Sequence, residues 1–184
     1  MRPIRSRTRF LGLSALAIAA IVPTVVWRSA HDRAHHENSL NYRLSYSMPT
    51  GWKAVEHSPQ TMFQFKNGDG VMIKAGKSQI VDDENPTPEL DRDTLSENFA
   101  SMTRSNLGWQ AAMGDVIEFN GGSYRLIRRE GKDRTIISAV AVRGNTTVII
   151  TLAAIGPAKS HVDEALPSFR DFLGNTKFTL QHFD

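Results

Sequence analysis

The sequence predicts an α+β domain in which helices pack on an antiparallel sheet, preceded by one N-terminal transmembrane helix. Three observations predict this class. Residues 10–27 contain no charged side chain. Residues 109–155 read as four strand-like segments separated by short turns with glycine, which favours an antiparallel meander. One helical segment with spaced apolar residues precedes these strands and another follows them, so we expect a helix on each face of the sheet.

The N-terminal segment predicts a signal-anchor helix. Residues 10–27 read FLGLSALAIAAIVPTVVW. A helix of this length spans about 27 Å, close to the roughly 30 Å of bilayer hydrocarbon. Four arginines precede the run, and the positive-inside tendency keeps such a segment in the cytoplasm. We therefore expect residues 1–9 to form a cytoplasmic basic tail, residues 10–27 to span the membrane, and residues 41–184 to fold outside the cytoplasm.

Two other interpretations of residues 10–27 stay open. A cleaved signal peptide would release a secreted domain, but it needs small residues before the cut. Pro23, Val25, Val26 and Trp27 do not provide them. The second alternative is a buried core helix.

The segment between the anchor and the domain, residues 28–40, is polar and predicts a stalk. Its histidines, His31, His35 and His36, could hold a divalent metal, although a solvated linker is the simpler interpretation.

Charge and cysteine content exclude several classes of function. The formal net charge is +3. Residues 1–37 hold six arginines and two acids, a net of +4, which leaves −1 for the rest. The domain therefore lacks the basic footprint of a nucleic-acid binder. There is no cysteine, which excludes disulfides, zinc–thiolate sites and thiol nucleophiles. Together with the anchor, this indicates the inner membrane of a bacterial envelope.

The expected elements of the domain follow from periodicity and turn signals. Residues 41–48 alternate as a strand, and Asn67-Gly68 predicts a hairpin. Residues 81–93 are rich in acids without the ligand spacing of a calcium loop, which favours a solvated loop. Thr94-Leu95-Ser96-Glu97 matches a capping box, so a helix is expected to begin there, with Leu95, Phe99 and Met102 as its apolar face.

The C-terminal part predicts a helix and an edge strand. The helix is expected to begin at Ser160 and to end at Gly174. Pro167 lies inside it, which predicts a kink or two short pieces. Residues 177–183 predict a last edge strand.

Two stretches resemble PsbP-like domains, a family that includes bacterial DcrB-like envelope proteins. Tyr46-Ser47-Met48-Pro49-Thr50-Gly51-Trp52 is similar to the family's opening strand and proline turn. Residues 147–178, an apolar strand followed by a helix with paired aromatics Phe169 and Phe172, are similar to its end. The resemblance covers about residues 40–180. It implies an α/β/α sandwich that acts as a non-catalytic accessory or binding domain, and it carries over no functional residues.

The sequence holds no catalytic motif. Gly-x-Ser-x-Gly, a P-loop, Gly-x-Gly-x-x-Gly and His-Glu-x-x-His are all absent. His161 with Glu164 or Asp163 could pair, and a hydrolase using this histidine or His57 is the alternative to a non-catalytic domain. We predict no enzyme activity, no cofactor and no metal. The expected contacts are the membrane, through residues 10–27, and a protein partner in the envelope.

Two groups of residues are candidates for contact with that partner. Arg125, Arg128, Arg129 and Arg134 lie on two consecutive predicted strands, where pairing could gather them for anionic headgroups or an acidic partner. A solvated face balanced by Glu118, Glu130 and Asp133 is the alternative. Trp52 and Trp109 each follow a glycine and could form a groove wall, or else pack at the edge of the core.

Overall fold

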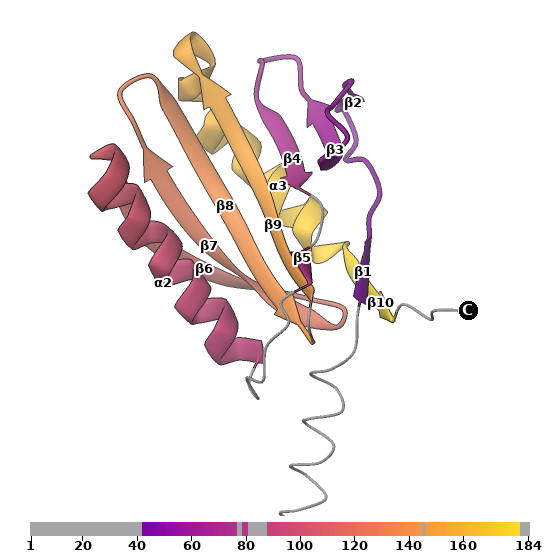
Figure 1. Ribbon diagram of the computed structural model, residues 1–184. Helices are drawn as coiled ribbons and strands as arrows, with labels where there is room; N and C mark the ends of the chain where they lie inside the picture. The colour runs from indigo at the N-terminus through magenta and orange to yellow at the C-terminus, as the bar shows by residue number, and fades with distance from the viewer. Residues whose placement is uncertain (1–41, 77–78, 81–87, 145, 181–184) are drawn as a thin grey trace, which may run out of the picture. The chain divides into compact units, whose positions relative to one another are not determined.

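The computed structural model describes residues 42–76, 79–80, 88–144 and 146–180. Eight strands form one antiparallel sheet in the order β2-β3-β4-β9-β8-β7-β6, with β5 also paired to β9 (Figure 1). Strands β1 and β10 form a separate antiparallel pair. The strands are β1 Tyr42–Ser45, β2 Lys53–Ala54, β3 Thr61–Lys66, β4 Met72–Gly76, β5 Gln79–Ile80, β6 Gln110–Phe119, β7 Gly122–Glu130, β8 Arg134–Arg143, β9 Thr146–Ile155 and β10 Lys177–Leu180.

The predicted meander and hairpin are both confirmed. Strands β6, β7, β8 and β9 pair in sequence order, each antiparallel to the next. The hairpin joins β3 to β4 in the register Lys66↔Met72. The Asn67 side chain closes the hairpin, because its Oδ1 accepts hydrogen bonds from the backbone N–H groups of Asp69 and Val71. Short connections of this kind make each strand the neighbour of the preceding one.

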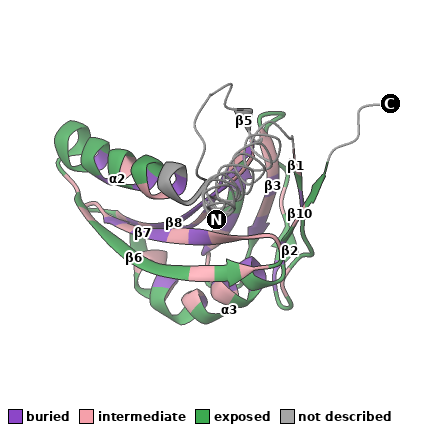
Figure 2. Cartoon of the chain, turned by 90° about the horizontal axis from the view of Figure 1, so that it is seen from below, coloured by how far each residue is buried: buried purple, intermediate pink, exposed green. Residues whose placement is uncertain are grey.

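Helices cover both faces of the sheet, so the α/β/α sandwich is confirmed. Helix α2, Pro88–Leu107, lies over β6, β7 and β8, and helix α3, Val162–Gly174, lies on the opposite face (Figures 1 and 2). The main core lies between the sheet and α3, where Phe169 and Leu173 are fully buried. A smaller cluster under α2 contains Ala100, Ile127 and Val140.

The predicted start of α2 is wrong. The helix begins at Pro88 rather than at Thr94, so residues 88–93 of the predicted acidic loop are helical. Proline suits the first turn of a helix, where its missing N–H costs nothing. The predicted capping box is not formed: the Glu97 carboxylate accepts a hydrogen bond from Arg104, and the Ser96 hydroxyl donates to the backbone oxygen of Arg92, one turn back. Residues 81–87 of the predicted loop lie outside the described residues.

The buried face of α2 also differs from the predicted one. Leu95 and Met102 are exposed, Met102 by 58%, whereas Arg92, Ser96 and Thr103 are buried. The sheet below carries polar side chains that pair with this face. The exposed apolar residues instead line a groove of about 200 Å³ with Val140, Thr147 and Ile149.

The C-terminal elements match the prediction in order and differ in their bounds. A 3₁₀ turn, Gly156–His161, precedes α3, which therefore begins at Val162 and not at Ser160. The helix is one element through Pro167 rather than two pieces. This proline opposes only the carbonyl of Asp163, in the first turn, which limits the disturbance. The helix ends at Gly174 as predicted, and the expected edge strand is present over Lys177–Leu180, whereas residues 181–183 of the prediction lie outside the described residues.

The predicted tail, residues 1–9, the predicted anchor, residues 10–27, and the predicted stalk, residues 28–40, lie outside the described residues. Among the helices that the structure does describe, none has the length and apolar character to cross a bilayer.

Removing a buried side chain from α3 should strongly reduce the stability of the fold. Phe169 is completely buried in the main core, so Phe169→Ala should lower the free energy of unfolding by about 3–5 kcal/mol. Leu107→Ala, at a residue of α2 that is 54% exposed, is the control and should cost under about 0.5 kcal/mol. Urea unfolding of the two variants measures both values, and equal effects would contradict the placement of the core.

Candidate functional site

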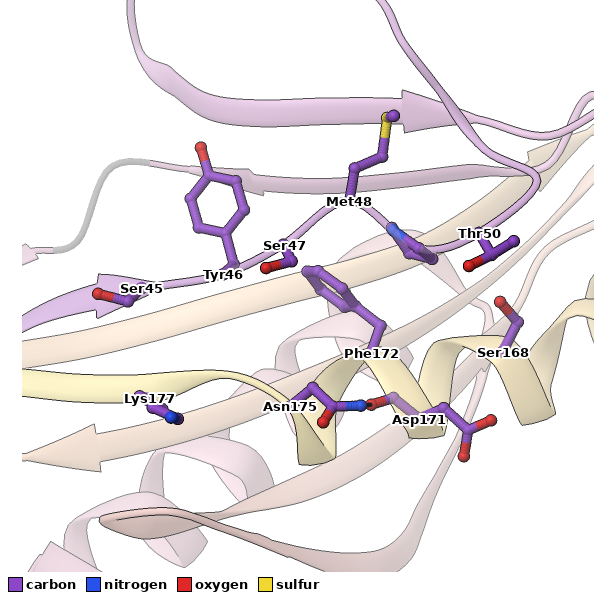
Figure 3. Close-up of a pocket in the computed structure, with 11 residues that line it drawn as sticks. Ser45, Tyr46, Ser47, Met48, Thr50, Ser168, Asp171, Phe172, Asn175 and Lys177 are labelled. Carbon is purple, nitrogen blue, oxygen red and sulfur yellow. Dashed lines mark hydrogen bonds between the residues drawn. The ribbon is translucent and has the colours of Figure 1, made fainter.

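A cleft of about 780 Å³ lies between residues 45–50 and the C-terminal half of α3 (Figure 3). We call it the α3 cleft. The wall opposite residues 45–50 consists of Ser168, Asp171, Phe172, Asn175 and Lys177. Ligand sites commonly measure about 300–1,000 Å³, so the size suits a ligand or a peptide segment.

Two contacts close the ends of the cleft. At one end, Ser45 of β1 pairs with Lys177 of β10. At the other end, the indole Nε1 of Trp52 donates a hydrogen bond of 3.1 Å to the Ser168 hydroxyl. A tight turn leads into Trp52, in which Gly51 has a φ of 82° and the Trp52 N–H bonds the Pro49 oxygen. The segment between Ser45 and Trp52 is thus held at both ends and open between them.

The end of α3 is fixed by a buried hydrogen-bond chain. The Thr176 hydroxyl donates to the Leu173 oxygen at 2.8 Å and therefore accepts from the Tyr124 hydroxyl at 2.9 Å. Burial raises the pKa of Tyr124 well above its ordinary range. The Asn175 N–H bonds the oxygens of Asp171 and Phe172, and its side-chain amide also donates to Asp171. These bonds satisfy the last carbonyls of the helix.

The lining of the cleft suits binding more than catalysis. Phe172 supplies an apolar floor, since its ring packs edge-on against Phe63 and Phe65. Asp171 and Lys177 are exposed, and in the described part of the chain neither charged group has an ion pair or a side-chain hydrogen bond. Neither a histidine nor a second carboxylate is among the described residues that line the cleft, and none of its hydroxyl groups forms a hydrogen bond with the side chain of Asp171 or Lys177 there.

The predicted arginine group is not brought together as one patch. Side chains alternate between the faces of β7, so Arg125 and Arg129 lie on the α2 face and Arg128 on the α3 face. Arg128 pairs with Asp163 of α3 at 2.5 Å and with Glu130 at 2.7 Å. Contact of these arginines with a partner or with headgroups stays a prediction.

Arg125 belongs to a charged network between β7 and α2. Its guanidinium binds both carboxylate oxygens of Asp93, at 3.0 and 3.2 Å. Arg92 binds the same carboxylate at the same distances and also bonds the Ser123 hydroxyl. These hydrogen bonds lower the pKa of Asp93 from 3.8 to about 2, and the bond from Arg125 has the largest effect.

The other two arginines contact aromatic rings. Arg129 is 8% exposed, lies 4.2 Å from the centre of the Phe99 ring, and donates to the Ser138 hydroxyl at 2.8 Å. Burial lowers its pKa. Arg134 pairs with Asp133 and lies 5.5 Å from the Trp109 ring. Arg129 is therefore packed under α2, where a partner has little access to it.

The two predicted groove tryptophans lie in different parts of the domain. Trp52 is 6% exposed and sits in the main core next to the α3 cleft, which it closes without lining it. Trp109 is half-buried and covers the turn between β7 and β8, where a Cβ on Gly131 would come within 2.8 Å of its ring. A shared groove wall is not formed, and a binding role for either residue stays a prediction.

The histidines do not form a catalytic or metal site within the described ranges. His161 pairs with Glu164 at 3.0 Å on the surface, which raises the pKa of the histidine, and His57 contacts the backbone oxygen of Ser58. No group of three metal-binding side chains occurs among the residues that were placed. His31, His35, His36 and His182 lie outside them.

Sequence reasoning missed the residues of the α3 cleft. Asp171, Asn175 and Lys177 carry no motif, and they face residues 45–50 only because α3 and β10 meet there. A usable signal was the alternation that continues from β1 through Tyr46 to Met48 although the strand ends at Ser45.

No family model matches the chain, and the search of curated proteins finds no relative. Among the solved structures that are similar to this chain are the following two. One is the cyanobacterial PsbP (CyanoP) of Synechocystis sp. PCC 6803, with 14% identity, a TM-score of 0.49, and coverage of 78% of this chain and 94% of that one. The other is LpqN, involved in cell envelope biogenesis of Mycobacterium tuberculosis, with 12% identity, a TM-score of 0.49, and coverage of 76% and 85%.

The Asp93 network predicts a loss of stability in acid. Because the folded-state pKa lies below the ordinary value, the charged carboxylate stabilises the fold above about pH 4, and this stabilisation is lost as the pH falls from 3.8 towards 2. The free energy of unfolding, measured with urea between pH 5 and pH 2.5, should therefore fall less steeply for Asp93→Asn than for the wild type. Arg125→Gln should also make the free energy of unfolding less dependent on pH, because it removes the main cause of the lowered pKa of Asp93. Parallel curves for all three proteins would show that the network does not act on stability.

Proposed function

We propose that this protein is a membrane-tethered, extracytoplasmic accessory domain without catalytic activity, which binds a protein partner in the α3 cleft. One observation carries the proposal: the cleft exposes two charged groups, the Asp171 carboxylate and the Lys177 ammonium group, for which the described residues provide no ion pair and no side-chain hydrogen bond. Groups of this kind exchange water for a partner at little cost, whereas the paired arginines would first have to break ion pairs.

The composition of the cleft supports a protein partner. Its walls combine hydroxyl and amide groups with one carboxylate, one ammonium group and an apolar floor. Interfaces combine the same elements, an apolar centre with a polar rim. The closed ends at Ser45–Lys177 and Trp52–Ser168 hold the walls in place before binding, which reduces the entropy that is lost on association.

The location rests on the sequence. Residues 10–27 would hold the domain at the inner membrane of a bacterial envelope, with four arginines on the cytoplasmic side. A tether of this kind limits the search for a partner to the neighbourhood of the membrane, which suits an accessory domain.

Photo-crosslinking from the cleft tests the binding function. A photoreactive phenylalanine analogue at Asp171 of the full-length protein should capture a specific partner in membranes. The same analogue at Glu164, exposed on the same helix but outside the cleft, is the matched control and should not. Products of equal yield and identity from both positions would mean that the cleft is not the contact surface.

Membrane extraction tests the anchor. The full-length protein should stay with the membrane pellet in alkaline carbonate and retain its N-terminal residues by mass spectrometry. A variant that lacks residues 1–27 should appear in the soluble fraction. A mature N-terminus after residue 27 would support the secreted alternative and would contradict the tether.

A further inference from the structure

The backbone of β1 continues past its last paired residue into the α3 cleft. Past Ser45 the chain runs on in the same direction, and the side chains of Tyr46 and Met48 point to the same side, away from α3 (Figure 3). The Tyr46 ring lies 4.2 Å from that of Phe63. Among the described residues, no backbone hydrogen bond engages the N–H or C=O of Tyr46, Ser47 or Met48.

The pairing of β1 with β10 shows which of these groups face the cleft. In an antiparallel pair, alternate residues direct both their N–H and their C=O towards the partner strand. Tyr42 directs these groups elsewhere, because its N–H and its C=O both bond the Thr146 hydroxyl, at 2.8 and 3.1 Å. The groups of Arg43 and Ser45 therefore point towards β10. By the same alternation, the N–H and C=O of Ser47 point into the cleft.

The partner strand ends before it can reach Ser47. The register pairs Ser45 with Lys177, so the next residue in line for Ser47 would be Asn175. The Asn175 N–H already bonds the Asp171 and Phe172 oxygens as the cap of α3. The backbone N–H and C=O of Ser47 thus point where a partner strand would lie, but no strand of the protein pairs with them. Unpaired backbone groups of this kind are a template for a further strand.

From this we propose, on the basis of the proposed function, that the α3 cleft binds an extended segment of a partner protein by strand addition at Ser47, with a basic side chain of that segment next to Asp171. Strand addition draws its affinity from main-chain hydrogen bonds and its selectivity from alternate side chains. The Asp171 carboxylate, exposed on the wall opposite Ser47, provides the charge complementarity.

A peptide library provides the probe. Random nonapeptides displayed on phage are selected against the full-length protein in detergent micelles, and the bound peptides are synthesised and titrated. Ser47→Pro removes the N–H that the peptide would use and should weaken binding about tenfold or more. Ser47→Ala keeps this N–H and should weaken binding far less than Ser47→Pro does. Met48→Pro places proline at a residue whose N–H points away from the cleft, and it controls for the effect of proline on folding.

The outcomes separate the inference from the proposed function. Loss of binding in Ser47→Pro alone, with a basic residue shared by the selected peptides, supports strand addition. Equal binding by Ser47→Pro and Ser47→Ala overturns strand addition. In that case the proposed function still stands if Asp171→Trp, which fills the cleft, abolishes binding while Glu164→Trp does not. If no peptide is selected, or if Asp171→Trp has no effect, the cleft is not a peptide site and the inference falls with it.

Discussion

The end of α3 is the constraint on which the candidate site depends. Tyr124, buried in β7, fixes Thr176, and Thr176 fixes the last turn of the helix through the Leu173 oxygen. The chain therefore turns from helix to strand within two residues, and β10 begins at Lys177. If β10 began later, it would pair with fewer residues of β1. If it began earlier, the protein's own strand would fill the α3 cleft. One buried hydroxyl pair thus sets both the length of β10 and the opening next to it.

Local signals were sufficient where one interaction dominates. The meander and the hairpin were predictable because asparagine and glycine dictate turns, and because β8 and β9 are apolar on both faces. The start of α2 was not predictable from local signals. The capping-box residues Thr94 and Glu97 are equally compatible with the interior of a helix, and tertiary pairing of Arg92 and Asp93 with β7 extends α2 by six residues beyond the predicted start.

The candidate site was less accessible to sequence reasoning for a related reason. Arginines on adjacent strands attract notice as a group, yet their spacing alone places Arg125 and Arg129 on one face of a strand and Arg128 on the other. Only the helix that covers each face could not be predicted before the fold was known. The structure uses Arg125 and Arg128 to fix a helix on each face, through Asp93 and Asp163. The α3 cleft, in contrast, is formed by residues of unremarkable type, and only their meeting in space distinguishes them.

The energetics of the cleft fit a domain that is held near its partner. Its polar groups are exposed to water, so each hydrogen bond to a partner contributes only about 0.5–1.5 kcal/mol net. An exposed pair at Asp171 adds at most about 1 kcal/mol. A few such contacts give weak binding in free solution. On the proposed function, the membrane tether compensates, because two proteins confined to one membrane meet at a raised effective concentration, so weak and reversible strand addition is sufficient.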